Sequence, residues 1–220
     1  TDMSPDDHYR SKMNMASMNA DAFNELVKTG ESYQYMTNTL QINSGLGVFS
    51  DVANLSGLSN TDWTWASLIV DMDNDGLKDI LISNGIKKDI DNNDYTKLVR
   101  NIDVNTTVDE LFEYSKNTPS KPVSNYAFKN KGQLKFEKVS KAWNFNIPSF
   151  SNGMAYGDLD NDGDLDVFTN NIDSPAFIYK NKATGNFLKI EFQGTKENQF
   201  GFGAKATIYY DNQMQTIEHA

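Results

Sequence analysis

Two nine-residue segments of this chain, 71–79 and 158–166, share the pattern D-x-D-N-D-G-x-x-D. Both place carboxylates at alternating positions of one short loop, and the glycine at position 6 permits the sharp turn that brings those carboxylates together. Carboxylate and carbonyl oxygens in a flexible loop are the ligands that Ca²⁺ prefers. The sequence therefore predicts two calcium sites.

The expected ligands of each site come from loop positions 1, 3, 5, 7 and 9. Position 7 supplies its backbone carbonyl, and the other four supply side-chain carboxylates. The two ligand sets are Asp71, Asp73, Asp75, Leu77 and Asp79, and Asp158, Asp160, Asp162, Asp164 and Asp166. The asparagine at position 4, Asn74 or Asn161, is expected to point away from the metal. The alternative is an Asp/Asn/Gly surface turn without a metal, in which the crowded carboxylates would repel one another.

The residues that follow the loops distinguish them from EF-hands. An EF-hand closes its site with a glutamate at position 12, where this chain has Ile82 and Thr169. Segments 80–82 and 167–169 are apolar and largely β-branched, which favours a strand over a helix. Each calcium loop is therefore expected to lie between two β-strands.

The two loops belong to a longer internal repeat, with units at about 38–84 and 125–171. A constant offset of 87 residues maps the pattern N-x4-N-x-G-x3-F-x2-V of the first unit onto the second. A third unit begins at about 175, because segment 177–181 resembles 126–130 at an offset of 51 residues. The N-x-G element is a hairpin signal. Repeats of about 50 residues with several strands each predict a mainly β fold built from β-propeller blades.

Helical signals interrupt these repeats in two stretches, 4–30 and 85–124. A Ser-Pro pair opens the first stretch and is typical of a helix start, while Thr107 and Glu110 form a capping box in the second. Further helices are expected at 19–28 and 94–101. Both inserts follow the same kind of junction, so we expect them to lie next to each other on one side of the blades.

The C-terminal segment differs from the repeats. Residues 187–192 alternate as a strand, 194–203 form a glycine- and asparagine-bearing loop, and 204–210 and 213–217 read as two further strands. This order predicts the start of a small antiparallel β module. At the other end of the chain, residues 1–3 are expected to form a strand belonging to a preceding blade.

These motifs carry a family resemblance. The D-x-D-N-D-G-x-x-D loops with their N-x4-N-x-G hairpins resemble the FG-GAP/VCBS repeats of integrin α-chain propellers and bacterial surface proteins. The run from N-F-L at 186–188 through G-T-K-E-N at 194–198 to G-F-G-A at 201–204 is similar to the opening of an ASPIC/UnbV module. Segments 9–12, 35–41 and 60–65 are similar to VCBS-repeat surface proteins of Bacteroidetes-type bacteria. The resemblance implies propeller blades over 1–185 and an ASPIC/UnbV-like β module over 186–220.

Composition restricts the partners and the location. The net charge of −10 disfavours binding to nucleic acid, and no apolar run is long enough for a transmembrane segment. The chain has no cysteine, which excludes a disulfide scaffold within it. Extracellular calcium is concentrated enough to fill weak loops that cytosolic calcium would leave empty. We therefore expect an extracellular or cell-surface protein associated with the outer membrane.

Catalysis is not expected, because the two histidines lack an evident acid–base partner and no nucleophile, phosphate-binding or metalloprotease motif is present. Segment 89–94 is either a third cation site, without the turn glycine, or a solvated loop. A group of aromatic residues either stacks on sugars or packs between blades: Tyr33, Tyr35, Trp63, Trp65 and Trp143.

Two classes of function are compatible with these features. The first is a calcium-stabilised, non-enzymatic adhesion module that mediates protein–protein contacts at the cell surface, with the calcium ions as structural staples. The alternative is a glycan-binding subunit of an outer-membrane assembly for polysaccharide uptake or processing. The expected partner is accordingly a surface protein or a glycan.

Overall fold

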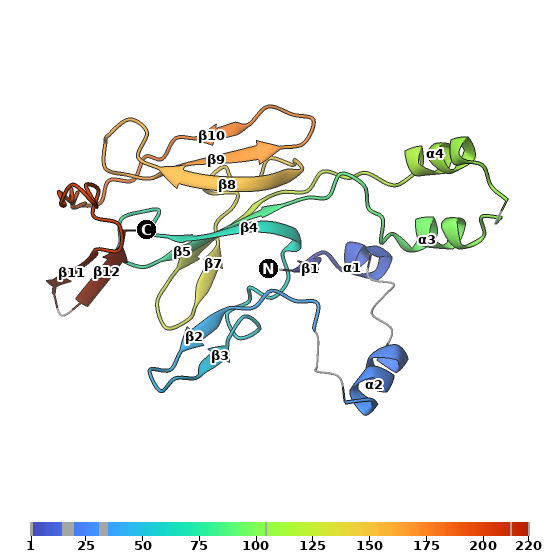
Figure 1. Ribbon diagram of the computed structural model, residues 1–220, viewed down its shortest axis with the longest axis horizontal. Helices are drawn as coiled ribbons and strands as arrows, with labels where there is room; N and C mark the ends of the chain where they lie inside the picture. The colour runs from blue at the N-terminus through green and yellow to red at the C-terminus, as the bar shows by residue number, and fades with distance from the viewer. Residues whose placement is uncertain (1, 15–19, 31–34, 104, 212, 220) are drawn as a thin grey trace.

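The computed structural model describes residues 2–14, 20–30, 35–103, 105–211 and 213–219. Strands make up 30% of the chain and helices 15%, so the predicted mainly β class is confirmed. The sheets are antiparallel and lie at the centre, with the helices projecting on one side and a C-terminal hairpin on the other (Figure 1).

Two sheets form the centre of the molecule. The larger has the order β1-β4-β5-β6-β7, with the strands β1 (Met3–Ser4), β4 (Asp62–Val70), β5 (Asp79–Asn84), β6 (Tyr126–Asn130) and β7 (Phe136–Lys138). The smaller has the order β10-β9-β8, with the strands β8 (Ser151–Gly157), β9 (Asp166–Asn171) and β10 (Phe177–Tyr179). Two separate hairpins are formed by β2 (Gln41–Asn43) with β3 (Phe49–Asp51) and β11 (Lys205–Tyr210) with β12 (Gln213–Glu218).

The units β4–β5 and β8–β9 have the same local structure. The β4–β5 register shifts between Thr64 and Ala66, and the β8–β9 register shifts between Ser151 and Gly153, which are the equivalent residues at the repeat offset. Strand β6 then pairs with β5 as β10 pairs with β9. A repeated sheet unit therefore begins with two strands that a calcium-type loop joins. It does not coincide with the sequence units 38–84 and 125–171, because each of these has its hairpin in one sheet and its last two strands in another.

Strand β5 packs against a different neighbour on each face, because successive side chains of a strand point in opposite directions. One face contributes Leu81 to a core cluster that spans both central sheets: Val70, Leu81, Ala127, Val139, Phe145 and Val167. The other face packs towards the preceding segment in a second cluster: Leu58, Ile80, Ile82 and Phe128. Burial on both faces explains why this segment is uniformly apolar rather than alternating.

Buried asparagine side chains join one repeat unit to the next. The Asn125 side chain accepts a hydrogen bond from the Asn84 backbone N–H (2.9 Å) and donates one to Ser151 Oγ (2.9 Å). Asn125 thus connects the end of β5 with the start of β8. Replacing a buried amide that both accepts and donates a hydrogen bond would leave its two partners without one. This cost accounts for an asparagine at the start of each unit.

The helical segments agree with the sequence prediction in three of four cases. The helices are α1 (His8–Asn14), α2 (Ala20–Lys28), α3 (Asn93–Arg100) and α4 (Val108–Lys116). The capping box of Thr107 and Glu110 is confirmed at the start of α4. The helix start at Ser4 is wrong: Ser4 lies in β1 opposite Asp62, and α1 begins at His8. None of the helices in the described ranges has the length and apolar character needed to cross a membrane.

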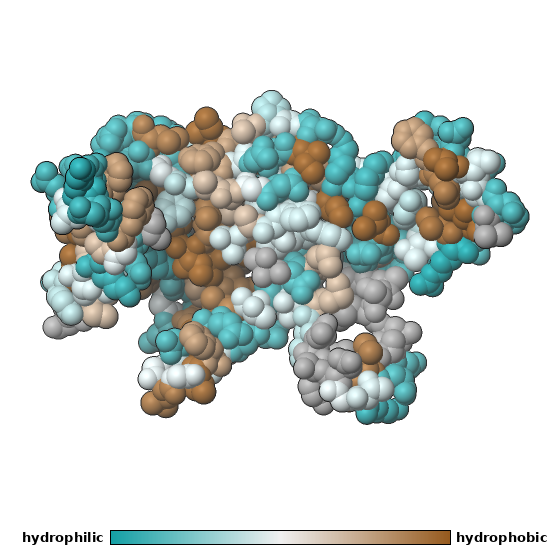
Figure 2. Space-filling model, in the orientation of Figure 1, coloured by the Kyte–Doolittle hydropathy of each residue, from teal (hydrophilic) through white to brown (hydrophobic). Residues whose placement is uncertain are grey.

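The two helical inserts meet, as expected from their equivalent junctions. Helix α1 contacts α3, and the Asn93 side chain donates a hydrogen bond to the Lys12 carbonyl (2.6 Å). Figure 1 shows α3 and α4 together at the far end of the second insert. Helix α1 lies beside the part of this insert that is nearest the sheets. Helices α3 and α4 contain no buried residue, and apolar surface is exposed at this end of the molecule (Figure 2).

The C-terminal prediction is partly wrong. The two strands after residue 203 are present as the hairpin β11–β12, but residues 187–192 form no strand. The ring of Phe187 lies on the calcium-type loop 158–166 instead, since a Cβ built on Gly163 would be 2.0 Å from Cε1 of that ring. Phe187 nevertheless remains 56% exposed, and Leu188 and Ile190 are exposed as well, so burial does not match the apolar alternation of this segment.

Candidate metal centres

The two loops have the same backbone conformation. The asparagine at position 4 and the glycine at position 6 both adopt positive φ, at 57° and 90° for Asn74 and Gly76 and at 61° and 91° for Asn161 and Gly163. Glycine and asparagine tolerate this left-handed region better than other residues. These two left-handed positions turn the chain sharply and bring carboxylates together, those of positions 1, 3 and 9 in the first loop and those of positions 1, 3 and 5 in the second.

In the first loop, carboxylate oxygens of Asp71, Asp73 and Asp79 lie within 4.8 Å of one another. Asp71 also accepts hydrogen bonds from the backbone N–H groups of Gly76 (2.8 Å) and Asp75 (3.2 Å), which holds the turn closed. The Oδ1 atom of Asp73 is buried and has no hydrogen-bond partner in the described part of the chain. A buried carboxylate oxygen without a partner is costly, and a bound cation would satisfy it.

In the second loop, carboxylate oxygens of Asp158, Asp160 and Asp162 cluster within 4.8 Å. The Oδ1 atoms of Asp158 and Asp164 are buried and lack a hydrogen-bond partner among the described residues. Asp164 was expected to offer only its carbonyl, yet its side chain is 3% exposed. Burial, together with the neighbouring carboxylate of Asp162, raises the pKa of Asp164.

The position-9 carboxylates bind backbone N–H groups with both oxygens. Asp79 accepts from Met72 (3.0 Å) and from Asn130 (2.8 Å), and Asp166 accepts from Leu159 (3.2 Å) and Asn181 (2.8 Å). Each of these carboxylates therefore closes its loop and attaches the loop to the end of a third strand. Burial raises the pKa of Asp79 to about 6; the backbone hydrogen bonds oppose this rise, and the charges of Asp73 and Asp75 add to it.

A lysine lies against each loop, and neither lysine was assigned a role from the sequence. Lys129 Nζ contacts the Asp73 carboxylate and lies 3.1 Å from that of Asp75. Lys180 Nζ contacts Asp160 and is 3.7 Å from Asp162. The Asp73 carboxylate raises the pKa of Lys129, so the ammonium remains charged. The Lys-Asn pair that ends segments 126–130 and 177–181 was the available signal.

Some of the predicted ligands of each loop lie within its oxygen cluster, and others lie outside it. Asp75 and Asp166 lie outside the tightest oxygen clusters; Asp75 accepts the Leu77 N–H (2.9 Å) and faces Lys129. The position-4 asparagines bond outside their own loops, as expected: Asn74 donates to the Gly163 carbonyl (3.4 Å) and Asn161 accepts from Lys189 Nζ (3.1 Å). The carbonyls of Leu77 and Asp164 remain predicted ligands.

The segment considered as a third cation site, 89–94, begins with a buried ion pair. Asp89 is buried and binds the guanidinium of Arg10, with 3.3 Å between Arg10 Nη1 and Asp89 Oδ2. Asn92 caps helix α3 through its side chain. Asp89 and Asn92 thus help to position the second insert, whereas Ile90 of the same segment is exposed. A cation site formed by the rest of segment 89–94 stays a prediction.

The aromatic candidates for sugar stacking are dispersed. Trp65 is 47% exposed and donates its indole N–H to the Gly85 carbonyl (2.7 Å), whereas Trp143 packs against the core cluster that spans both sheets. Tyr33 lies outside the described residues, and Tyr35 is exposed. Of the two histidines, His8 is exposed on α1 and His219 stacks on Phe202, with 5.2 Å between ring centroids.

Comparisons with known proteins do not add to this picture. No protein-family model matches the chain, and no curated protein matches it. The functional argument therefore depends on the geometry of the two loops and their surroundings.

Proposed function

We propose that this chain is a calcium-stabilised, non-enzymatic binding module of the cell surface, built from FG-GAP/VCBS-type propeller blades. The observation that carries the proposal is the pair of equivalent loops in which three carboxylates converge and buried oxygens lack partners. The donor set is entirely oxygen and anionic, which suits a hard divalent cation. Calcium would neutralise the carboxylates and hold each loop between its two strands.

The proposed role of calcium is structural, because none of the described residues beside the loops is arranged for catalysis. The neighbouring bases are carboxylates and the neighbouring acids are ammonium groups already paired with them. Calcium held in this way would make the sheet units rigid supports for the segments between them. Binding functions commonly lie on such segments.

Lys129 and Lys180 are assigned the role of internal counter-ions in the metal-free loops. Lys129→Met should raise the calcium affinity of the first loop by about tenfold, since displacing the ammonium from Asp73 and Asp75 opposes binding by about 1.4 kcal/mol. Isothermal titration with calcium measures this change. Lys131→Met is the matched control, because Lys131 pairs with Glu137 (3.5 Å) rather than with the loop. A weaker affinity in Lys129→Met would instead mean that the ammonium supports the loaded site.

The α3–α4 hairpin is the proposed contact surface for a protein partner. Five apolar residues are exposed on its two helices: Leu98, Val99, Val108, Leu111 and Phe112. Exposed apolar residues on a projecting element are typical of recognition surfaces. The hairpin is also separated from the sheets by a short neck, where the Asp89 N–H donates to the Pro119 carbonyl (2.8 Å).

Excising residues 91–116 and joining the ends with a Gly-Ser linker should leave a folded, calcium-binding protein that has lost its partner. The neck remains intact, because Asp89 keeps its bonds to Arg10 and Pro119. Pull-down from outer-membrane extract, with bound proteins identified by mass spectrometry, provides the measurement. Phe112→Ser should weaken the same capture, and Asp109→Ala on the same helix should leave it unchanged. Undiminished capture after excision would contradict the assignment.

A cavity between the two central sheets favours the alternative, a glycan-binding subunit of an outer-membrane polysaccharide assembly. The cavity has a volume of about 560 Å³ and is lined by aromatic and polar side chains that include Trp143, Tyr179, Asn144 and Lys182. A glycan array separates the two functions, since sugar binding that Trp143→Ala abolishes would support the alternative.

A further inference from the structure

The chain segment that leaves β10, residues 181–189, crosses both metal loops. The Asn181 amide nitrogen donates to the Met72 carbonyl of the first loop (2.7 Å) and to the Leu165 carbonyl of the second (3.1 Å). The backbone N–H of Asn181 also donates to the Asp166 carboxylate (2.8 Å). One residue therefore holds atoms of both loops, although it is 109 positions from Met72 in the sequence.

Asn130 provides an internal comparison within the same molecule. It occupies the equivalent position at the end of β6 and makes the equivalent local bonds, to the Lys78 carbonyl (2.9 Å) and to the Asp79 carboxylate (2.8 Å). Both of these partners belong to the first loop. The bond across to a second loop is thus a feature of Asn181 and not of the repeated position in general.

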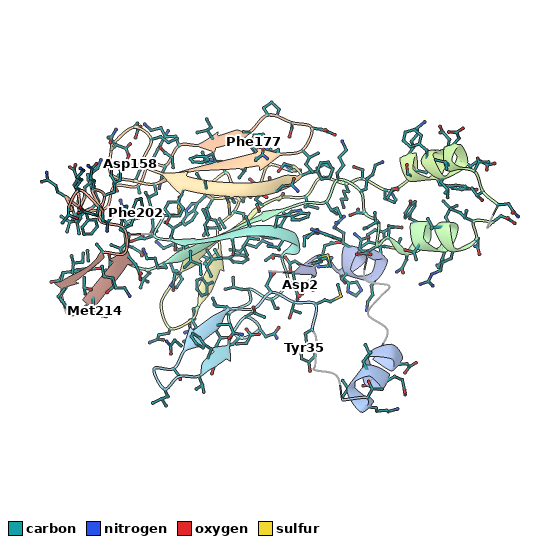
Figure 3. The ribbon with its side chains drawn as sticks, viewed as in Figure 1. Asp2, Tyr35, Asp158, Phe177, Phe202 and Met214 are labelled. Atoms are coloured by element: carbon teal, nitrogen blue, oxygen red, sulfur yellow. The ribbon has the colours of Figure 1, made fainter. Side chains whose placement is uncertain are left out.

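Further contacts join the loops to each other and to the same segment. Asn74 donates to the Gly163 carbonyl (3.4 Å), which is a direct bond from the first loop to the second. A Cβ built on Gly185 would lie 2.4 Å from the Asn74 Cβ, so the segment passes directly over the first loop. Figure 3 shows Asp158 of the second loop on the same side of the molecule as Phe202 of the C-terminal segment.

We propose that the two loops bind calcium as one cooperative unit, with Asn181 as the positioning residue that couples them. The inference rests on the proposed function, because it concerns the same two sites. Calcium in the first loop fixes the Met72 carbonyl and thereby Asn181, which in turn holds Leu165 and Asp166 in place. The second ion then meets a loop that is already ordered, and its binding requires less ordering.

Repulsion between the two ions acts in the opposite direction but does not cancel this effect. Residues 71–79 carry four aspartates and one lysine, and residues 158–166 carry five aspartates, so each loop keeps a net negative charge when Ca²⁺ has displaced its lysine counter-ion. The neighbouring loop therefore still attracts a cation. Order transmitted through Asn181 determines the sign, and we expect the coupling to be positive.

Calcium titration of loop-disabled variants tests the proposal. Asp160→Ala disables the second loop, and it should weaken calcium binding at the first loop by at least about fivefold, the lower end of common coupling strengths. In an Asn181→Ser background the same disabling substitution should weaken the affinity of the first loop clearly less, because only the direct bond from Asn74 to the Gly163 carbonyl then remains between the loops. Serine is chosen because its hydroxyl can still accept the Lys182 and Ala183 N–H groups that Asn181 Oδ1 accepts at 2.8 and 3.2 Å.

Asn130→Ser is the matched control, since it alters the equivalent residue without touching the contact between loops. The coupling should persist in that background. A second measurement is hydrogen exchange of residues 183–189 in Asp160→Ala, which should slow when calcium fills the first loop alone. This measurement uses the native asparagine and so stands even where Asn181→Ser folds poorly.

The outcomes separate this inference from the proposed function. Two calcium ions that bind the unaltered protein independently or with negative cooperativity would overturn the coupling and leave the calcium sites intact. Loss of coupling in Asn130→Ser to the same degree as in Asn181→Ser would overturn the role of Asn181. Failure of the unaltered protein to bind any calcium would overturn both proposals.

Discussion

Removing calcium is expected to lower the melting temperature of this protein by about 10–20 °C. Binding to the folded state alone stabilises it by about 2.7 kcal/mol per site at a hundredfold excess over the dissociation constant. Two sites therefore contribute about 5 kcal/mol, and each kcal/mol shifts the melting temperature of a chain of this length by about 2–4 °C. Thermal denaturation followed by circular dichroism, with calcium and with a chelator, measures the shift.

Substitutions within the loops should show how much each site contributes to this shift of the melting temperature. Asp73→Ala and Asp160→Ala each remove one member of an oxygen cluster, so each variant should lose roughly half of the calcium response or more. Asp109→Ala is the control, because it removes an exposed carboxylate of helix α4 outside both loops. Melting temperatures that are the same with and without calcium in the unaltered protein would contradict the structural role of the metal.

Replacing Arg10 is the second change with a large expected effect. Its guanidinium lies between two buried carboxylates, with 2.7 Å from Nε to Asp62 Oδ2 and 3.3 Å from Nη1 to Asp89 Oδ2. All three side chains are less than 10% exposed. Arg10→Ala would leave both carboxylates without a counter-ion, and breaking a buried pair in this way costs about 3–5 kcal/mol. Chemical denaturation monitored by tryptophan fluorescence measures the loss.

The matched control is an ion pair that joins the same insert to the same sheet at the surface. Lys138 Nζ lies 2.8 Å from Asp6 Oδ2, and both side chains are about half exposed. Lys138→Ala should cost less than about 1 kcal/mol, because solvent screens the pair. The triple variant Arg10→Met, Asp62→Asn, Asp89→Asn should recover part of the stability lost in Arg10→Ala, since it buries no unpaired charge. Equal losses of stability in Arg10→Ala and Lys138→Ala would contradict the stabilising role of the buried ion pairs of Arg10.

Local patterns in the sequence predicted the loops and the helices at the second insert. The two D-x-D-N-D-G-x-x-D loops specify their turns through residues only a few positions apart, such as Asn74 and Gly76, which adopt the positive φ that such a turn needs. The capping box of Thr107 and Glu110 likewise lies within one helical turn. Local structure that depends on residues close together in the sequence can therefore be predicted from the sequence.

Long-range contacts could not be predicted in the same way. Lys129 lies 56 positions from Asp73, and Arg10 lies 52 positions from Asp62 and 79 from Asp89. The repeated Lys-Asn pair marked the two lysines as equivalent, but nothing in the sequence connected them with the loops, and nothing connected Arg10 with Asp62 or Asp89. The strand expected at 187–192 is absent, and its apolar residues Phe187, Leu188 and Ile190 remain exposed instead of packing on a sheet.

The measurement that tests the central claim most directly is the amount of calcium bound by chelator-stripped protein after dialysis against calcium. Elemental analysis should give two ions per chain for the unaltered protein and one or fewer for Asp73→Ala and for Asp160→Ala. The Asp109→Ala control should retain two. An unaltered protein that binds no calcium, with Lys129 and Lys180 as the permanent cations of the two loops, would contradict the account.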